Sequence, residues 1–359
     1  MLNIAILGYG TVGKGTAQVL MKNKEQIQKR LGKEFNIKYI LDLREFPGDP
    51  LEDRVVHDFR IIENDPDVSI VAEMLGGSHP AYDFTVAALR AGKNVVTSNK
   101  EVVERFGEEL LRIADENNIR YRFEASVGGG IPVISPLIHS LTAQNTITEI
   151  NAILNGTTNY ILSRMRNEGL PYDEVLSEAQ KLGYAEADPS ADVDGWDACR
   201  KICILAAIAF GKLIPKDAVK TRGIRDITLD HIKKAEESGA KIRLIGRAVK
   251  LDDGRIHLSV EPYAVKNENP LAGVDDVFNA IMVRGDSVGD VMFYGRGAGM
   301  LPTASAVVSD IVDIMARGDS FAADEALRFE QAPELYAPEL PADLIAATKE
   351  ALGTPVFEM

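Results

Sequence analysis

The chain has 359 residues, a formal net charge of -14 and a pI near 5.0. So acidic a chain lacks the basic face that nucleic acid or an anionic membrane requires, and neither is expected as a partner. Its length suffices for two domains, each with its own core. These numbers favour a soluble enzyme with a small-molecule substrate.

The cellular location is predicted from the cysteines and the apolar segments. The two cysteines, Cys199 and Cys203, stand one helical turn apart in an apolar segment, which is typical of apolar packing in a reducing compartment. No signal peptide precedes the first strand, and no apolar run is long enough to cross a bilayer. We therefore expect a cytoplasmic protein.

The N-terminal segment LNIAILGYGTVGKGTAQVL has the pattern of a dinucleotide-binding turn. A buried strand over 2–7 leads through a glycine turn into a helix. In this order, the glycines allow a tight turn, a close approach of the backbone to a pyrophosphate, and close packing of the helix. The helix N-terminus then offers amide donors to the phosphates. The cofactor contacts expected from this turn are Gly8, Gly10, Thr11, Val12 and Gly13.

Strands and helices alternate over the rest of the first domain. This alternation predicts a doubly wound parallel sheet, which binds ligands at the carboxyl ends of its strands. Strands are expected at 37–42, 68–74, 94–98 and 119–124, and helices at 80–91 and 101–117. Candidate cofactor contacts at the strand ends are Asp42, Gly76, Ser98 and Lys100.

The end of the second strand, YILDLRE, leaves the choice of cofactor open. Asp42 would accept hydrogen bonds from the ribose hydroxyls of NAD, whereas Arg44 would accommodate the 2′-phosphate of NADP. We therefore expect NAD(P). Lys100 follows a strand directly, so its ammonium would face the cofactor or the substrate; an ordinary surface lysine is the alternative.

The pattern changes after about residue 134 and predicts an α+β domain with a largely antiparallel or mixed sheet. A strand ending near Asn155 leads through the turn and cap NGTTN into a helix. Further helices are expected at 172–182, 195–211 and 229–238, and strands at 240–251, 255–265, 277–284 and 288–295. A long apolar helix ending near residue 318 returns to the first domain. The predicted division is a cofactor-binding domain over 1–133 and about 296–320, a catalytic and dimerisation domain over 134–295, and a tail over 321–359.

An acidic stretch, GYAEADPSADVDGWDACRK, precedes a helix that is apolar on nearly every face. Lys201 follows Asp197 by one turn, so the two share a face and the lysine can be held partly desolvated beside a carboxylate. The alternative is a helix cap, with Asp194 at the N-cap and Asp197 in the first turn. Capping explains neither Glu186 nor Asp192. We expect Asp188 to be a turn residue and Asp194 to be the N-cap.

Six motifs, by their order and spacing over about residues 2 to 318, resemble the homoserine dehydrogenase family. They are GYGTVGKG, TSNKE, EASVGGGIPVI, LNGTTNYIL, GYAEADPSADVDGWDACRKICILA and GRGAGMLPTASAVV. Enzymes of that family interconvert L-homoserine and L-aspartate 4-semialdehyde with a nicotinamide cofactor, in threonine, isoleucine and methionine biosynthesis. The resemblance also implies a Rossmann-type cofactor domain and a homodimer built on the sheet of the second domain.

The resemblance assigns roles to individual residues. It implies that Lys201 handles the proton at the substrate oxygen and that Lys100 serves catalysis and cofactor contact. The acids that match the binding site of the substrate amino group are Glu186, Asp192 and Asp197. Lys100 and the amides of Gly156 and Thr157 are candidates for the substrate carboxylate. The match to the family's sodium or potassium site consists of Glu124 and the carbonyl groups of Val127, Gly129 and Ile131.

Two departures from the family pattern bear on function. Leu41 stands where the family often carries an arginine for the 2′-phosphate, so we expect NAD to be accepted at least as well as NADP. The chain also ends too soon for the ACT regulatory domain of many members. The alternatives are another amino-acid-linked NAD(P) dehydrogenase on the same architecture and a non-enzymatic NAD-sensing module.

Overall fold

The computed structural model describes residues 1–317 and 327–359, which form two compact units. The first unit comprises Met1–Ile134 and Ala298–Arg328, and the second comprises Ser135–Gly297 and Phe329–Met359. The segment expected as a separate tail therefore joins the second unit from Phe329 onward. The part of that tail before residue 327, and the end of the expected first domain from 318, lie outside the described residues.

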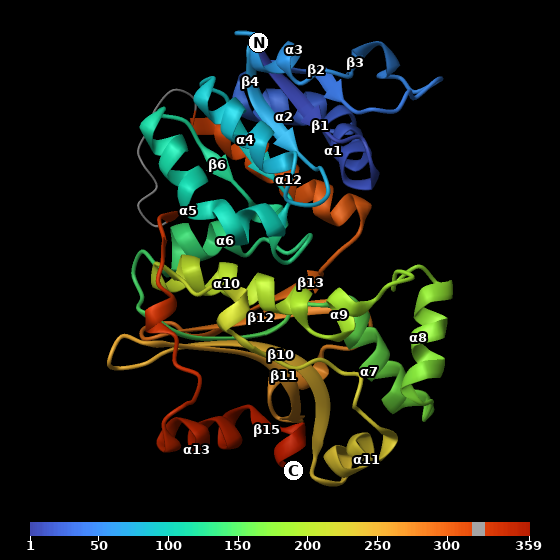
Figure 1. The fold of residues 1–359 in the computed structure, drawn as a ribbon, viewed down its shortest axis with the longest axis vertical. Helices are drawn as coiled ribbons and strands as arrows, with labels where there is room; N and C mark the ends of the chain where they lie inside the picture. Colours follow the sequence, from blue (N-terminus) through green and yellow to red (C-terminus); the bar gives the residue numbers. More distant parts are fainter. Residues whose placement is uncertain (318–326) are drawn as a thin grey trace. The chain divides into compact units, whose positions relative to one another are not determined.

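The first unit is built on a six-stranded sheet in which every pairing is parallel (Figure 1). The strand order β3-β2-β1-β4-β5-β6 reverses its direction of winding between β1 and β4. The strands are β1 (Leu2–Leu7), β2 (Phe35–Leu41), β3 (Val55–Val56), β4 (Val68–Glu73), β5 (Asn94–Thr97) and β6 (Tyr121–Arg122). The predicted Rossmann-type sheet is confirmed, and its switch point lies at the carboxyl ends of β1 and β4.

Helices cover this sheet because its central strands are apolar on both faces. They are α1 (Thr11–Lys22), α2 (Lys24–Leu31), α3 (Arg60–Glu63), α4 (Ala81–Arg90), α5 (Lys100–Glu116) and α12 (Met300–Arg317). α4 packs with α5, and α12 packs with α1 (Figure 1). Gly15 of α1 permits this approach, because a Cβ there would lie 2.9 Å from the backbone oxygen of Met300. The core of the first unit therefore includes a helix from near the end of the chain.

The second unit has a seven-stranded, largely antiparallel sheet, as predicted. Its main order is β13-β12-β7-β10-β11-β15, with β9 added parallel to β11. These strands are β7 (Ile147–Ile153), β9 (Lys220–Thr221), β10 (Ala240–Lys250), β11 (Ile256–Lys266), β12 (Phe278–Gly285), β13 (Gly289–Arg296) and β15 (Gly353–Pro355). β8 (Lys212–Leu213) and β14 (Glu330–Gln331) form a separate parallel pair. The C-terminal segment thus contributes strands to this unit.

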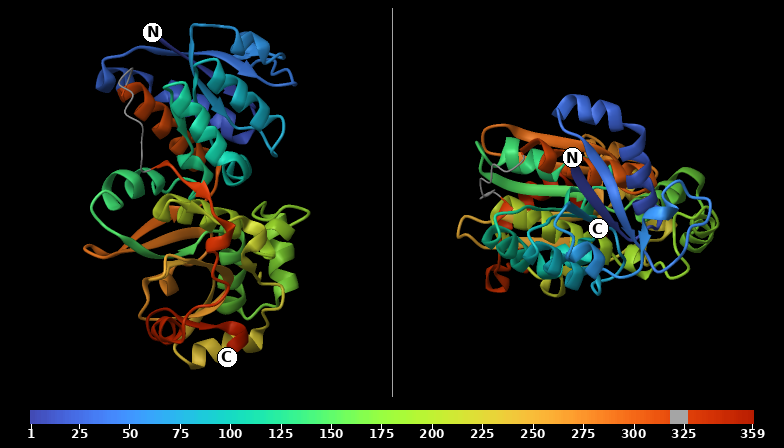
Figure 2. Two further views of the ribbon diagram at one scale, coloured as in Figure 1. Left: turned by 60° about the vertical axis from the view of Figure 1, so that its left-hand side comes forward. Right: turned by 90° about the horizontal axis from the view of Figure 1, so that it is seen from above.

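Helices α7 and α10 pack on the sheet of the second unit (Figure 2). Gly246 of β10 allows the close approach of α10, because a Cβ there would lie 3.3 Å from Ile202. The helices are α6 (Ile134–Pro136), which leads the chain into this unit, α7 (Gly156–Glu168), α8 (Tyr172–Lys181), α9 (Ser190–Val193), α10 (Trp196–Phe210), α11 (Leu229–Glu237) and α13 (Ala342–Ala351). Cys199 and Cys203 of α10 are buried, as expected for apolar packing residues. No helix in the described part of the chain is both long and apolar enough to span a membrane.

Candidate functional site

The glycine turn between β1 and α1 has the geometry that a pyrophosphate needs. Gly8 has a φ of +87°, and a Cβ there would lie 2.9 Å from the Met74 carbonyl oxygen. A Cβ at Gly13 would lie 2.0 Å from the Gly8 oxygen, whereas the space beside Gly10 is open. Gly10 is the N-cap of α1 and offers no side-chain cap, so the first-turn amides, including those of Thr11 and Val12, are left for another acceptor. These residues fit a dinucleotide cofactor.

The end of β2 presents a carboxylate and a guanidinium as one paired group. Asp42 accepts hydrogen bonds from the Tyr9 N–H at 2.8 Å and from Arg44 Nε and Nη2 at 2.9 Å each. These bonds, that with Arg44 first, lower the pKa of Asp42 well below its usual range, so it is ionised. Leu41 is buried in the core and brings no polar atom to this edge. The expected ribose contacts, Asp42 and Arg44, are therefore bonded to each other at the end of β2.

The ends of β4 and β5 carry the remaining expected cofactor contacts. Gly76 is exposed in the loop after β4, with open space around it. Ser98 lies between β5 and α5, and its N–H donates to the Glu73 carbonyl at 3.4 Å. Lys100 is the first residue of α5, whose N-cap is Asn99. The structure thus gathers the expected residues of the first unit at one edge of one sheet.

Lys201 lies in a buried network of the second unit. Its Nζ donates to an Asp197 carboxylate oxygen at 2.7 Å and to the Leu154 carbonyl at 2.8 Å. Lys201 is 8 % exposed and Asp197 is 4 % exposed. The i, i+4 spacing on α10 brings the two together as predicted. An ammonium held in this way can stabilise negative charge on a bound oxygen and exchange a proton with it.

Asn155 connects this pair to a second carboxylate, and sequence reasoning missed it as a site residue. Its Nδ2 donates to Asp192 at 2.7 Å and to Asp197 at 2.9 Å. Its Oδ1 accepts from the Thr158 N–H at 2.8 Å and so caps α7. The sequence identified the cap in NGTTN, and the available signal was that an amide, unlike a hydroxyl, has two further hydrogens to donate.

The other expected substrate contacts surround the start of α7. A Cβ at Gly156 would lie 2.8 Å from the Val277 carbonyl, which explains the glycine. The Thr157 hydroxyl donates to the Tyr184 carbonyl at 2.8 Å. Glu186 follows two residues later and is exposed, with its carbonyl accepting from Gln180 at 3.1 Å. The structure therefore places Glu186 at the surface, outside the buried hydrogen bonds of the Lys201 network.

The predicted cap at Asp194 is wrong. The N-cap of α10 is Gly195, with a φ of +88°, and Asp194 instead forms an ion pair with Arg225. Thr221 and Val260 pack closely around Gly195 and leave little room for a side chain there. The helix therefore begins at a glycine, which has no side chain that could cap it. Asp197 does lie in the first helical turn, and Asp188 accepts from the Ser190 N–H at 3.1 Å as a turn residue.

The segment matched to the cation site is buried in the first unit. One Glu124 oxygen accepts from the N–H groups of Val133 and Ile134 at 2.7 and 2.8 Å. Between them the chain turns at Gly128 and Gly129, which have φ values of +77° and +56°. A buried carboxylate followed by a turn rich in carbonyl oxygens is suitable donor chemistry for a hard cation. No cluster of three or more His, Cys, Asp or Glu side chains suited to a metal occurs among the described residues.

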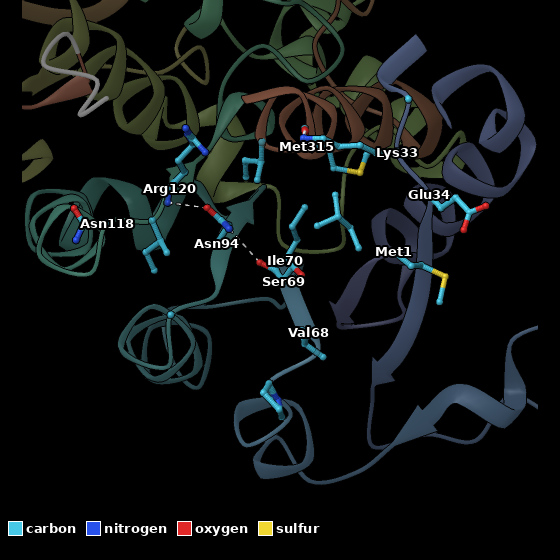
Figure 3. Close-up of a pocket in the computed structure, with 16 residues that line it drawn as sticks. Met1, Lys33, Glu34, Val68, Ser69, Ile70, Asn94, Asn118, Arg120 and Met315 are labelled. Atoms are coloured by element: carbon cyan, nitrogen blue, oxygen red, sulfur yellow. Dashed lines mark hydrogen bonds between the residues drawn. The ribbon is translucent and has the colours of Figure 1, made fainter. Parts of the chain in front are cut away.

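A cavity of about 670 Å³ lies elsewhere in the first unit (Figure 3). It is lined by the starts of strands rather than by their ends: Leu2 of β1, Val68 of β4 and Asn94 of β5. Asn94 donates to the Ser69 carbonyl and accepts from the Arg120 N–H, which joins the strand starts (Figure 3). Because parallel sheets bind cofactors at the opposite edge, this cavity is not the cofactor site.

The switch-point glycine turn and the desolvated lysine–carboxylate pair define the class: an NAD(P)-dependent oxidoreductase. Two family models agree. One, described as the NAD-binding domain of homoserine dehydrogenase, matches residues 8–124, and another, described as homoserine dehydrogenase, matches residues 132–312. The chain belongs to the homoserine dehydrogenase family.

Relatives and solved structures point the same way. The chain is 45 % identical to homoserine dehydrogenase of Synechocystis and 42 % identical to that of Bacillus subtilis, each match covering 88 % of this chain and 73 % of the relative. A homoserine dehydrogenase structure from Thiobacillus denitrificans superposes with a TM-score of 0.87 at 39 % identity, covering 94 % of this chain and 79 % of that one. A hyperthermophilic archaeal homoserine dehydrogenase in complex with NADPH has a TM-score of 0.75 at 29 % identity, over 88 % of this chain and 98 % of that one.

Proposed function

We propose that this homoserine dehydrogenase uses Lys201 as the group that moves the proton at the substrate oxygen. The observation that carries the assignment is the buried Lys201–Asp197–Leu154 geometry. Nicotinamide, when bound, accepts the hydride from the carbon that bears the homoserine hydroxyl, and returns it in the reverse direction. Lys201 takes the hydroxyl proton as the neutral amine during oxidation, and as the ammonium it donates a proton to the developing alkoxide during reduction. Asp197 keeps the ammonium in reach.

The carboxylates around Asn155 bind the substrate through its α-ammonium. Asp192 and Glu186 provide charge-assisted acceptors, and Asn155 fixes Asp192 relative to Asp197. The amides at Gly156 and Thr157 start α7 and supply donors for the substrate carboxylate, as does Lys100. These roles require an amino-acid substrate, which separates this enzyme from dehydrogenases of simple hydroxy acids.

The cofactor is held by the Gly8–Gly13 turn, by Asp42 and Arg44, and by Gly76, Ser98 and Lys100 at the neighbouring strand ends. A sodium or potassium ion is assigned to Glu124 with the carbonyl groups of Val127, Gly129 and Ile131. The support for it is the donor chemistry of that turn. The protein acts in the cytoplasm; the support is that both cysteines are buried in the apolar helix α10, which is typical of a reducing compartment.

A homodimer forms through the sheet of the second unit. The support is strand β13, whose side chains alternate so that Met292 and Tyr294 face outward, 40 % and 53 % exposed. By register they lie beside Met282 and Ala280 of β12, so an apolar face continues inward from them. A second copy that presents the same apolar face would cover both.

The test of the catalytic assignment is Lys201→Met. Turnover with homoserine should fall by at least about 10²-fold while cofactor affinity stays nearly unchanged. The matched control is Lys93→Met, because Lys93 is also a buried lysine, 2 % exposed, that donates to backbone carbonyls. The control should lose stability but keep its kcat. Near-normal kcat in Lys201→Met would remove Lys201 from the mechanism.

The substrate assignment is tested by following absorbance of the reduced nicotinamide with homoserine and a panel of other hydroxy and amino acids. Turnover that is fastest with homoserine supports it. Faster turnover of another amino acid would favour a different amino-acid-linked dehydrogenase. Cofactor binding without turnover of any member would favour a sensing module.

A further inference from the structure

Glu73 is the last residue of β4 and is fully buried, with 0 % exposure. It lies at the carboxyl edge of the sheet, where the proposed cofactor contacts gather. Burying a carboxylate without a cationic partner costs free energy, so a glutamate at this position is more readily explained by a specific role. The hydrogen bonds of Glu73 indicate what that role is.

The Glu73 carboxylate joins two segments of that edge. One oxygen accepts from the Leu75 N–H at 2.7 Å, in the loop that contains Gly76. The other accepts from the Thr97 hydroxyl at 2.6 Å, at the end of β5. The Met74 carbonyl of the same loop lies against Gly8 of the glycine turn. The carboxylate is therefore bonded to the loop after β4, which lies against the glycine turn, and to the end of the next strand in the sheet, β5.

The connection continues to Lys100. Thr97 Oγ1 accepts from the Asn99 N–H at 2.9 Å, so the Thr97 proton must point to Glu73. Asn99 Oδ1 caps α5, and its Nδ2 donates to the Leu75 and Gly77 carbonyls at 3.2 and 2.7 Å. Glu73 thereby fixes the N-terminus of the helix that begins with Lys100.

We propose that Glu73 is a positioning residue for the cofactor: its ionised carboxylate holds the 74–77 loop and the 97–100 turn in the arrangement that binds the nicotinamide dinucleotide. The inference rests on the cofactor contacts of the proposed function. It predicts a pH dependence, because both groups aimed at the carboxylate are donors. When the carboxyl is protonated, its own O–H faces one of these two donors, so one of the two hydrogen bonds is lost.

The pKa of Glu73 places this change in an accessible range. Burial raises it to about 7, against the opposing effect of the hydrogen bonds from Thr97, Leu75 and Asn99. Of the groups on neighbouring elements, the buried Tyr121 phenol of β6 senses the Glu73 charge. Lys100 begins α5, and Asp310 of α12 is buried with Glu124, Arg122 and Asp313 as its electrostatic neighbours.

Helix α4 also packs against β4 and carries three titratable groups, Tyr82, Asp83 and Arg90. Its Tyr82 hydroxyl donates to Glu109, and Asp83 forms an ion pair with His79. Arg90, at the C-terminal end of α4, is exposed. Since each of these groups remains in a Glu73 variant, the difference between wild type and variant isolates the titration of Glu73.

The experiment measures the Kd of NADH or NADPH by nicotinamide fluorescence, without substrate, from about pH 5.5 to about pH 8.5. Wild type should bind roughly tenfold more tightly above the midpoint near pH 7 than below it. Glu73→Gln should bind weakly, with no such step. The matched control Glu104→Gln, a buried glutamate of α5, should keep the wild-type step.

A second pair of variants keeps the test decisive if Glu73→Gln fails to fold. Thr97→Val removes the donor and should move the midpoint to higher pH, whereas Thr97→Ser should restore it. An equal step in Glu73→Gln and wild type would overturn the proposal, as would weaker wild-type binding above pH 7, which is what simple repulsion of the phosphates predicts. Absence of cofactor binding in wild type at any pH would overturn the cofactor assignment itself.

Discussion

Asn155 is the residue at which the fold of the second unit and the proposed chemistry depend on each other. The single oxygen of its side-chain amide caps α7, and the amide nitrogen donates to two carboxylates of the acidic stretch. A single substitution would change both, so a variant that separates them is needed.

Asn155→Ser makes that separation, because serine caps a helix but cannot reach both Asp192 and Asp197. Asn155→Ala should lose about 1 kcal/mol of unfolding free energy together with most of its activity. Asn155→Ser should recover the stability while kcat stays at least about tenfold low. Denaturant unfolding and steady-state kinetics measure the two effects. Recovery of kcat along with stability would mean that only the cap matters.

Substitution of Glu186 should have a different kinetic effect, because Glu186 is exposed and assigned to the proposed ammonium site. Glu186→Gln should raise the KM for homoserine more than it lowers kcat, since an ammonium partner contributes mainly uniform binding. Glu174→Gln, on the exposed face of α8, serves as the control. An unchanged KM in a folded Glu186→Gln protein would remove the residue from the substrate site.

Single residues of the site were predictable where local geometry determined their neighbours. The i, i+4 spacing brought Lys201 and Asp197 together without reference to the rest of the fold. Asp194 was not predictable, because its partner Arg225 is distant in the sequence and the adjacent glycine made a cap unnecessary. The double role of Asn155 also required knowing that Asp192 returns to it.

Among elements, the β2 end and its loop should determine which cofactor is used. Asp42 neutralises Arg44 through paired hydrogen bonds, so the guanidinium is not fully available to a 2′-phosphate. We therefore expect NAD to be accepted at least as well as NADP. Asp42→Ser should free Arg44 and shift the ratio of kcat/KM values toward NADP by roughly tenfold.

Arg44→Ala is the companion variant, and it should shift that ratio toward NAD. Initial rates with both cofactors at saturating homoserine measure the change. A wild-type preference for NADP of about a hundredfold or more would show that Arg44, or another cation, overrides the pairing.

Long periodic elements were predictable, and short ones were not. The helices α4, α5, α8, α10 and α11 and the strands β10 to β13 lie close to their expected ranges. Strands β3 and β15, of two and three residues, have no periodicity to detect, and each is formed by pairing with a longer strand. For the same reason the C-terminal segment looked like a tail.

For the whole molecule, the apolar face at β13 predicts the oligomeric state. Tyr294→Asp combined with Met292→Asp should convert the proposed dimer to a monomer, because each substitution would bury a charge in the interface. Leu182→Asp is the matched control, since Leu182 is 55 % exposed at the end of α8. Sedimentation velocity distinguishes the species. A dimer that survives the double substitution would place the interface elsewhere.

The stability of the whole molecule should also depend on Glu73. Its pKa rises from 4.5 to about 7 on folding, so the folded state binds the proton more tightly than the unfolded state. The resulting stabilisation is complete below pH 4.5 and is lost as pH rises to about 7, for a total of about 3 kcal/mol. Glu73→Gln should therefore gain stability relative to wild type between about pH 5 and pH 8. Denaturant titrations at the two pH values measure this, and a constant difference would contradict it.

The packing of α12 on α1 has a consequence for how the protein is made. The core of the first unit is shared between the beginning of the chain and a helix from Met300–Arg317. During translation, one apolar face of the N-terminal sheet stays uncovered until α12 has been synthesised. Before that, more than 160 residues of the second unit, Ser135–Gly297, must be translated. The second unit lacks only its last segment at that stage. We expect the cofactor-binding half, although translated first, to complete its core only after most of the second unit has been synthesised, and to depend on chaperones during that interval.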